Sequence, residues 1–223
     1  MPRPSQQIDQ SLLAAGRELF PDAGCAGLSV RALAAHAGVA PGMFHYHFGS
    51  KDRFLRALFA DLYESMFASL AREAALPAGP LERLRAVMTL FARFARTHRR
   101  LLARLWIDAL SGHDAARDFF REHAPRHAGL MLQLIGQAQA GGALRELPPL
   151  QCLAFLMGAV PMPMIFAAGL VDDGLLVPGA MRAFDAQVMS ERATDARIDL
   201  ALAALAADVP RSAPGRPKRE RAR

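Results

Sequence analysis

Two histidines flank a tyrosine in the aromatic stretch GVAPGMFHYHFGSKDRF, which spans residues 38–54. Alternate side chains of a β-strand share a face, so on a strand His45 and His47 could hold one metal ion. On an α-helix the same side chains point about 200° apart, because each residue advances the helix by about 100°. The chemistry of this stretch therefore depends on whether the segment is a strand or a helix.

A second histidine pair occurs in the segment EHAPRH, where His123 and His127 lie four residues apart and Glu122 is adjacent. This spacing resembles the arrangement of metal ligands on one face of a helix. Pro125 between the histidines predicts a kink, and the arginines on either side favour a solvent-facing helix. An all-helical metal-binding protein or enzyme that uses the His123/His127 region therefore remains an alternative function.

Motifs for catalysis are absent beyond residue 80. This part of the sequence has no G-x-S-x-G pattern, no phosphate-binding loop and no H-E-x-x-H pattern. The two cysteines, Cys25 and Cys152, are far apart and lack the C-x-x-C spacing of zinc sites and redox centres. We therefore expect a protein that is not an enzyme, with no catalytic residues, no metal and no cofactor.

Helical periodicity runs through most of the chain. Apolar residues recur at intervals of three or four, as at Ile8, Leu12, Ala15 and Leu19, and no stretch alternates convincingly with a period of two. Breakers such as GVAPG, PAGP and GGALRELPP separate the periodic segments. The pattern predicts an all-α chain of about nine or ten helices. Short helices over residues 6–20, 30–37 and 41–47 precede a long fourth helix, which indicates two modules.

Local residue chemistry indicates that the opening stretch is helical. Ser29 is a good N-cap for a helix over residues 30–37, Gly38 can end that helix, and Pro41 fits the first turn of the next. On this next helix Phe44 should face the core and Tyr46 should point outward. Two short helices joined by a glycine-containing turn form a helix-turn-helix, and its geometry prevents the H-x-H pair from sharing a metal ion.

The segment LSVRALAAHAGVAPGMFHYHFGSKDRFLRAL, residues 28–58, resembles the N-terminal domain of the tetracycline-repressor (TetR) family of bacterial transcriptional regulators. An alanine-rich helix leads through a Gly-Val turn into a recognition helix with a Y-x-H-F pattern, and a lysine then opens the fourth helix. The resemblance implies a helix-turn-helix DNA-binding domain at residues 1–52, with the fourth helix starting near residue 50. It further implies a helical effector-binding and dimerisation domain at residues 53–208.

The resemblance also assigns roles to residues around the recognition helix. Arg31 matches a position from which some family members read a guanine, whose O6 and N7 suit a guanidinium fork. His45 stands where the family usually has a tyrosine, so an imidazole would have to replace that contact. The positions nearest the base edges are Pro41, Gly42 and Met43. The positions that match phosphate-backbone contacts are Ser29, Tyr46, His47 and Lys51.

In this family the rest of the chain binds a small effector and forms a homodimer. The dimer would use helices near residues 150–170 and 194–208. Methionine and aromatic residues at helical spacing could line the effector site, although the same pattern is typical of an ordinary core. The predicted ligand-binding residues are Phe94, His98, Trp106, Met131, Met157, Met162 and Phe166. Asp108 and Gln133 are possible additional polar contacts.

Much of the formal net charge of +6 lies at the C-terminal end. From Arg211 onward six cations face the single anion Glu220, a balance of +5. Because residues 209–223 are rich in Pro, Gly and Arg, they cannot bury enough apolar surface to offset their ordering entropy. We expect a disordered basic tail that could add sequence-independent attraction to DNA.

The uncharged segment at residues 152–171 is just long enough to span a membrane, which leaves a membrane-anchored sensor as a third hypothesis. Pro161 and Pro163 near its middle instead favour a buried helix. No apolar leader follows the N-terminal MPRPSQQIDQ, and the cysteine usage suits a reducing compartment. We therefore expect a cytoplasmic homodimeric repressor that a small, largely apolar effector releases from an inverted-repeat operator in double-stranded DNA.

Overall fold

The structure, a computed structural model, describes residues 4–167, 170–171, 174–175 and 177–207. These residues confirm the expected all-α class, and the predicted basic tail lies outside them. The helices are α1 (Pro4–Gly27), α2 (Val30–His36), α3 (Pro41–Phe48), α4 (Lys51–Ala74), α5 (Pro80–Thr97), α6 (Arg99–Leu110), α7 (Asp114–Ala140), α8 (Pro149–Ala159), α9 (Pro161–Ala167), α10 (Pro178–Phe184) and α11 (Glu191–Leu205). A short π-helical segment, Asp185–Met189, joins α10 to α11.

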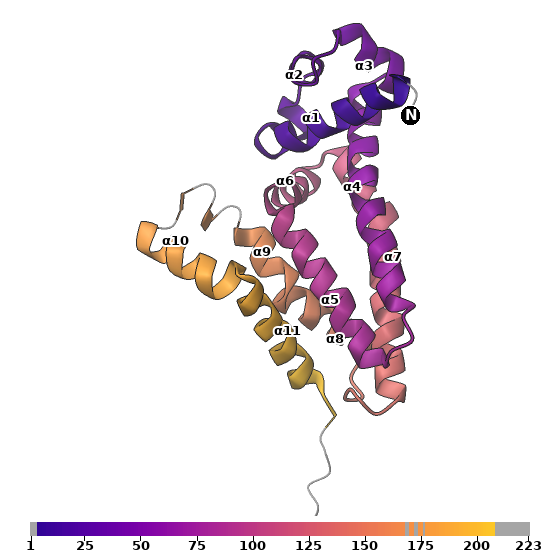
Figure 1. Cartoon of the computed structure of the whole chain (residues 1–223), viewed down its shortest axis with the longest axis vertical. Coiled ribbons are helices and arrows are strands. Elements are labelled where there is room, and N and C mark those ends of the chain that lie inside the picture. Colours follow the sequence, from indigo (N-terminus) through magenta and orange to yellow (C-terminus); the bar gives the residue numbers. More distant parts are fainter. Residues whose placement is uncertain (1–3, 168–169, 172–173, 176, 208–223) are drawn as a thin grey trace, which may run out of the picture.

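The first three helices form a small cluster at one end of an elongated molecule (Figure 1). Helix α4 leaves this cluster and runs along the body beside α7, with α5 packed against both. Helix α6 lies directly below the cluster and packs against α1. Helix α9 packs against α5 and α6, α8 packs against α7 and α9, and α11 packs against α5 and α8. Helix α4 thus connects the N-terminal cluster to the body, and α6 packs against the cluster.

The turns of the N-terminal cluster follow from the residues that the sequence places there. The Ser29 hydroxyl accepts the backbone N–H of Ala32 at 3.1 Å and caps α2, as predicted. Gly38 ends the helix with a φ of 67°, a left-handed conformation that a glycine adopts without strain. Pro41 occupies the first turn of α3, and the Ser50 hydroxyl caps α4. Local chemistry therefore sets the helix-turn-helix geometry.

Helix α4 contributes to two separate hydrophobic clusters. Its N-terminal half carries Phe54 and Phe59 into a cluster with α1 and α3, where the Phe54 ring lies 5.2 Å from the Phe44 ring. Its C-terminal half places Leu70 in a second cluster with α5, α7, α8 and α11. Because α4 is one continuous helix with residues in both clusters, it links the N-terminal helices rigidly to the body.

The buried carboxylate of Asp108 fastens the end of α1 to α6. Asp108 is 1% exposed and is the only buried charged residue in the part of the chain that the structure describes. Its Oδ2 accepts the backbone N–H of Cys25 at 2.6 Å, and its Oδ1 accepts the Arg104 Nε at 3.1 Å. Any Cβ at Gly24, where φ is 62°, would collide with the Arg104 guanidinium. Asp108 thus belongs to this junction, which corrects its suggested role as a polar contact for an effector.

Two proline-containing segments were singled out by the sequence. Helix α7 extends from Asp114 to Ala140 and includes Pro125, where the sequence predicted a kink. Its packing against α4, α5 and α6 outweighs the loss of one backbone hydrogen bond at the proline. The apolar stretch Pro149–Ala167 is long and apolar enough to cross a membrane, with a mean hydropathy of 1.8, but 44% of it is buried within the fold. Helix α8 ends at Ala159, and α9 begins at Pro161.

We predict that Asp108→Ala will lower the free energy of unfolding by about 2–3 kcal/mol, because it leaves the Cys25 N–H and the Arg104 guanidinium without their acceptor. Urea denaturation followed by circular dichroism measures this change. The control Asp195→Ala removes an exposed carboxylate from α11 and should change stability by no more than about 0.5 kcal/mol. Equal effects of the two substitutions would contradict the proposed role of the junction.

Candidate DNA-binding surface and ligand cavity

The outer face of α3 is formed by the side chains expected at the base edges and the phosphate backbone. Tyr46 is 79% exposed, and its neighbour His45 is also exposed. Phe44 is fully buried on the opposite face of the helix, as the helical spacing predicted. Pro41 and Gly42 are exposed at the start of α3, and Met43 is half-buried. Helix α3 therefore exposes one face to solvent, while Phe44 on the opposite face is buried in the hydrophobic core.

Three further predicted DNA-contacting residues surround this face. Arg31 is exposed in the first turn of α2, two residues after the N-cap Ser29. The Lys51 ammonium donates to the carbonyl oxygen of Ala26 at 3.1 Å, so it also supports the end of α1. An ammonium has three donors, and this bond leaves two of them for a phosphate. These cations lie on α2 and α4, on either side of α3 in the sequence.

His47 is oriented differently from the other predicted DNA-contacting residues. Its side chain is only 5% exposed, and its Nδ1 lies 2.5 Å from Oδ1 of Asp9 on α1. The helical period explains this position, because residue 47 is three residues after the buried Phe44 and falls about 60° from it around the helix. The structure therefore separates His47 from the exposed set and places it in the contact between α3 and α1.

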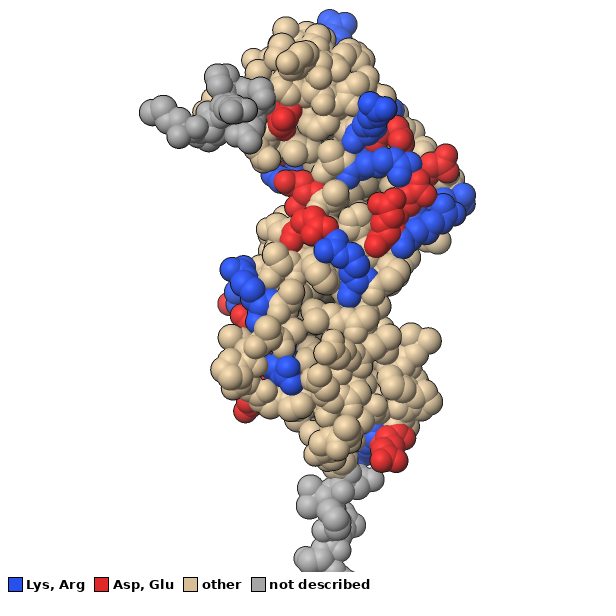
Figure 2. All heavy atoms as spheres, turned by 90° about the vertical axis from the view of Figure 1, so that its right-hand side faces the viewer, with Lys and Arg blue, Asp and Glu red and all other residues tan. Residues whose placement is uncertain are grey.

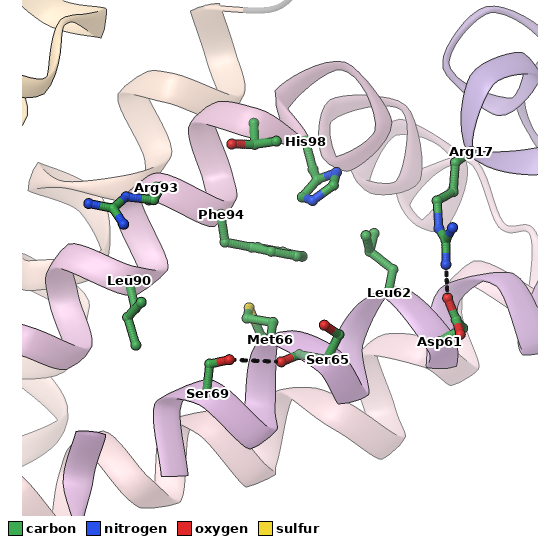
Figure 3. A pocket seen from close by; sticks show the side chains of 11 residues that line it. Arg17, Asp61, Leu62, Ser65, Met66, Ser69, Leu90, Arg93, Phe94 and His98 are labelled. Carbon is green, nitrogen blue, oxygen red and sulfur yellow. Dashed lines mark hydrogen bonds and ion pairs between the residues drawn. The ribbon is translucent and has the colours of Figure 1, made fainter. Parts of the chain in front are cut away.

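The α4–α5 cavity, a hollow of about 520 Å³, opens between α4 and α5 beside α1 (Figure 3). Phe94 and His98, two of the predicted ligand-binding residues, lie on its wall. Sequence reasoning missed the charged residues of this cavity, Arg17, Asp61 and Arg93. Arg17 forms an ion pair with Asp61 and thereby connects α1 to α4. The apolar wall of the α4–α5 cavity is formed by Leu62, Met66, Leu90 and Phe94.

The other predicted ligand-binding residues lie elsewhere. Trp106, Met162 and Phe166 line a second hollow of about 570 Å³ between α6, α9 and the end of α1. Met131 is fully buried in the second hydrophobic cluster, which also contains Leu70, and Met157 packs against the same cluster. The seven predicted residues thus belong to two separate cavities and a packed core. Helical spacing cannot distinguish these environments, because each presents apolar side chains on one face.

Burial also determines the environment of His123 and His127. His127 packs against the rings of Tyr63 and Phe91, and burial lowers its pKa. The Tyr63 hydroxyl donates to the His123 carbonyl oxygen at 2.8 Å, and burial raises the pKa of Tyr63 to about 12. Within the described residues no three His, Cys, Asp or Glu side chains gather in a metal-binding arrangement. The histidine pair that suggested a metal site is part of an aromatic cluster between α4 and α7.

Charged side chains of both signs cover the outer faces of α4 and α7. Figure 2 shows them across the middle of this side of the molecule, whereas the lower part of the same side is largely uncharged. Arg56 of α4 pairs with Asp118 of α7 at 2.6 Å, and Arg126 of α7 pairs with Glu64 of α4. Such surface pairs contribute little stability individually. Among the described residues on this side of the molecule, positive and negative side chains are therefore mixed.

A helix-turn-helix whose recognition helix faces solvent from a three-helix domain defines a DNA-binding protein. Residues 12–58 match the family model described as "Bacterial regulatory proteins, tetR family". No curated protein matches the chain in sequence. The match covers the helix-turn-helix and supports a DNA-binding role for this part of the chain, and the chain as a whole has the fold of TetR-family regulators.

Solved structures of TetR-family and related regulators share the fold over nearly the whole chain. The ketosteroid transcriptional regulator KstR2 of Mycobacterium tuberculosis gives a TM-score of 0.67 at 17% identity, covering 90% of this chain and 95% of that one. FadR from Bacillus subtilis, solved in complex with stearoyl-CoA, gives a TM-score of 0.65 at 16% identity. The match covers 88% of this chain and 98% of that one. The TetR-family regulator PfmR from Thermus thermophilus gives a TM-score of 0.64 at 22% identity. The match covers 86% of this chain and 97% of that one.

We predict that His127→Leu will reduce the loss of stability in acid. Because the folded state lowers the pKa of His127, the unfolded chain binds its proton more readily, and stability falls as the pH drops below about 6.5. One such histidine contributes at most about 1.4 kcal/mol per pH unit. The Tyr63 hydroxyl keeps its backbone acceptor in this variant. Urea denaturation at pH 7.5 and 5.5 measures the difference.

His113→Gln serves as the control for this prediction, because His113 precedes α7 and lies outside the aromatic cluster. This variant should retain the pH dependence of the wild-type protein. The burial of His98, which also lowers its pKa, should leave a smaller residual dependence in His127→Leu. An unchanged acid sensitivity of His127→Leu would contradict the assignment.

Proposed function

We propose that this chain is a homodimeric transcriptional repressor that a small molecule releases from an inverted-repeat operator. The observation that carries the proposal is the continuity of α4. Its first residue, Lys51, adjoins the recognition helix, and its Asp61 and Met66 line the α4–α5 cavity. A ligand in that cavity would therefore contact the same helix that supports the DNA-binding surface.

An inverted repeat is the form of operator that suits a symmetric dimer. Two copies related by a twofold axis present two α3 helices with opposite polarity, and each would enter a major groove. The exposed Tyr46 and His45 would approach the phosphate backbone, and the start of α3 would approach the base edges. Arg31 would read a guanine from α2.

The proposed dimer interface is an apolar face formed by α8 and α11, which pack against each other. On α8, Leu150 and Phe155 are 67% and 43% exposed, although both are large and apolar. On α11, Leu200 is 72% exposed among exposed alanines at positions 196, 203 and 204. Small residues allow helices to approach closely, and large exposed apolar patches mark interaction sites. A second copy would bury this face and the exposed part of the stretch that resembles a membrane span.

The effector would occupy the α4–α5 cavity, whose volume of about 520 Å³ lies in the range of small-molecule sites. Among proteins with the same fold, KstR2 is named a ketosteroid transcriptional regulator, and FadR was solved in complex with stearoyl-CoA, which carries a long apolar chain. Phe94, Met66 and Leu90 supply the apolar wall that a molecule of this kind requires. A regulator of this type acts on chromosomal DNA, which supports a cytoplasmic location.

We predict that selection from random duplexes with the full-length protein will enrich an inverted repeat, and that Arg31→Ala and Lys51→Ala will then differ. Loss of Arg31 should relax preference at one base pair in each half-site, at a cost of about 1–3 kcal/mol. Loss of Lys51 should weaken binding to all sequences alike. It should also reduce the slope of the logarithm of the binding constant against the logarithm of the salt concentration by about one. Enrichment of a single unsymmetrical site, or identical shifts in both variants, would contradict the proposal.

We predict that Leu200→Asp will convert the dimer to monomers at micromolar concentration, because an aspartate would be buried without a partner in the interface. Light scattering of the purified protein measures the molar mass. Leu175→Asp is a matched control, because Leu175 is also 72% exposed but lies in the chain between α9 and α10 rather than on α8 or α11. A monomeric wild-type protein, or dissociation in both variants, would show that α8 and α11 do not form the interface.

A further inference from the structure

The α4–α5 cavity combines an apolar wall with an excess of positive charge. Arg17 and Arg93 contribute two guanidinium groups, and Asp61 is the only acidic residue in the lining. Asp61 already pairs with Arg17. Arg93 forms no ion pair within the described residues, but it also lines a hollow with Glu191 and Asp195 and interacts electrostatically with Glu191. Because the lining of the α4–α5 cavity holds two guanidinium groups and one carboxylate, it favours a ligand that carries negative charge.

The charged groups lie at the ends of the cavity rather than around its middle. In Figure 3, Arg17 and Asp61 lie at one end and Arg93 at the other, while Phe94 and Met66 face each other between them. His98 reaches in from the end of α5, and its ring centroid lies 4.7 Å from that of Phe94. The lining therefore matches an amphipathic molecule, with an apolar body along Phe94 and an anionic group at an end.

The end at Arg17 offers the better-built anion site. His98 lines this end beside Arg17 and Asp61 (Figure 3), and burial together with the neighbouring Arg17 lowers its pKa. A carboxylate placed here could accept hydrogen bonds from the Arg17 guanidinium in a bidentate arrangement. To do so it would have to compete with Asp61, which now occupies that guanidinium.

The pair that the ligand would disrupt joins the two modules. Arg17 lies on α1, in the DNA-binding domain, and Asp61 lies in the middle of α4. Their side chains are 35% and 31% exposed, so the pair is accessible to an exchanging anion and contributes only modest stability. Replacing Asp61 by a ligand carboxylate would transfer Arg17 from a contact with α4 to a contact with the ligand.

We propose that the α4–α5 cavity binds a small organic carboxylate with an apolar body, and that its carboxylate displaces Asp61 from Arg17. This inference rests on the proposed function, because it specifies the ligand class and the contact through which that ligand acts. It replaces the expectation of a largely apolar effector with an amphipathic anion. Binding then exchanges a protein–protein ion pair between α1 and α4 for a protein–ligand ion pair.

Matched acids and amides test the charge requirement. Isothermal titration calorimetry of the full-length protein with 4-phenylbutanoate and octanoate, each compared with its uncharged amide, measures the contribution of the carboxylate. The acids should bind about tenfold or more tightly than the amides, as expected for a charge-assisted hydrogen bond. Arg17→Gln should remove this preference. If no acid binds more tightly than its amide, the proposal is overturned.

The proposed displacement of Asp61 gives a second test, in which a substitution should strengthen the binding of the acids rather than weaken it. Asp61→Asn removes the competing carboxylate, so the affinity for the acids should rise about two- to fivefold while the affinity for the amides stays unchanged. Asp22→Asn is the matched control, because Asp22 pairs with Arg100 at 2.5 Å between α1 and α6, at the other cavity. This control should leave both affinities unchanged.

Weaker acid binding in Asp61→Asn, or an equal rise in Asp22→Asn, would also overturn the proposal. In either case the change would reflect a general loosening of α1 rather than competition for Arg17. The operator selection described above does not depend on these ligands. A protein that selects an inverted repeat but shows no preference for acids would retain the proposed function and lose only the assigned ligand class.

Discussion

A carboxylate can be buried only where donors replace the water it loses, and Asp108 meets this condition at a single point, the end of α1. The Cys25 N–H and the Arg104 guanidinium supply those donors. Because Gly24 allows close approach of the backbone, α1 ends against α6 in one defined position. The direction in which the chain enters α2 follows from this junction, and the orientation of the recognition helix follows in turn. The position of the DNA-binding surface relative to the body thus depends on the buried side chain of Asp108.

The helix-turn-helix was predictable because its determinants are local. Ser29, Gly38 and Pro41 act through bonds within a few residues, and the structure places α2 and α3 within a residue of the predicted ranges. Helical spacing also separated Phe44 from Tyr46. It did not separate the exposed His45 from the buried His47, because histidine is compatible with both environments and a sequence motif carries no information about the contact with Asp9.

The cavities were not predictable in the same way. Arg17 and Asp61 are 44 residues apart in the sequence, and only the packing of α1 on α4 brings them together. Trp106 and Phe94 both belong to apolar stripes, yet they line different hollows, because α5 and α6 turn their stripes toward different neighbours. Assigning a residue to a cavity requires the positions of at least three helices. Periodicity provides one face of one helix at a time.

Helix α4 has 24 residues and is therefore about 36 Å long, and it connects the body to the domain that carries the recognition helix. A tilt of about 3° at its far end would move its first turn by about 2 Å. Donor–acceptor distances in hydrogen bonds vary over only about 0.5 Å. In a dimer the two α4 helices would move apart or together, so the displacement between the recognition helices would double. A change too small to disturb the packing of the body could therefore shift the two helices out of phase with the turns of the duplex.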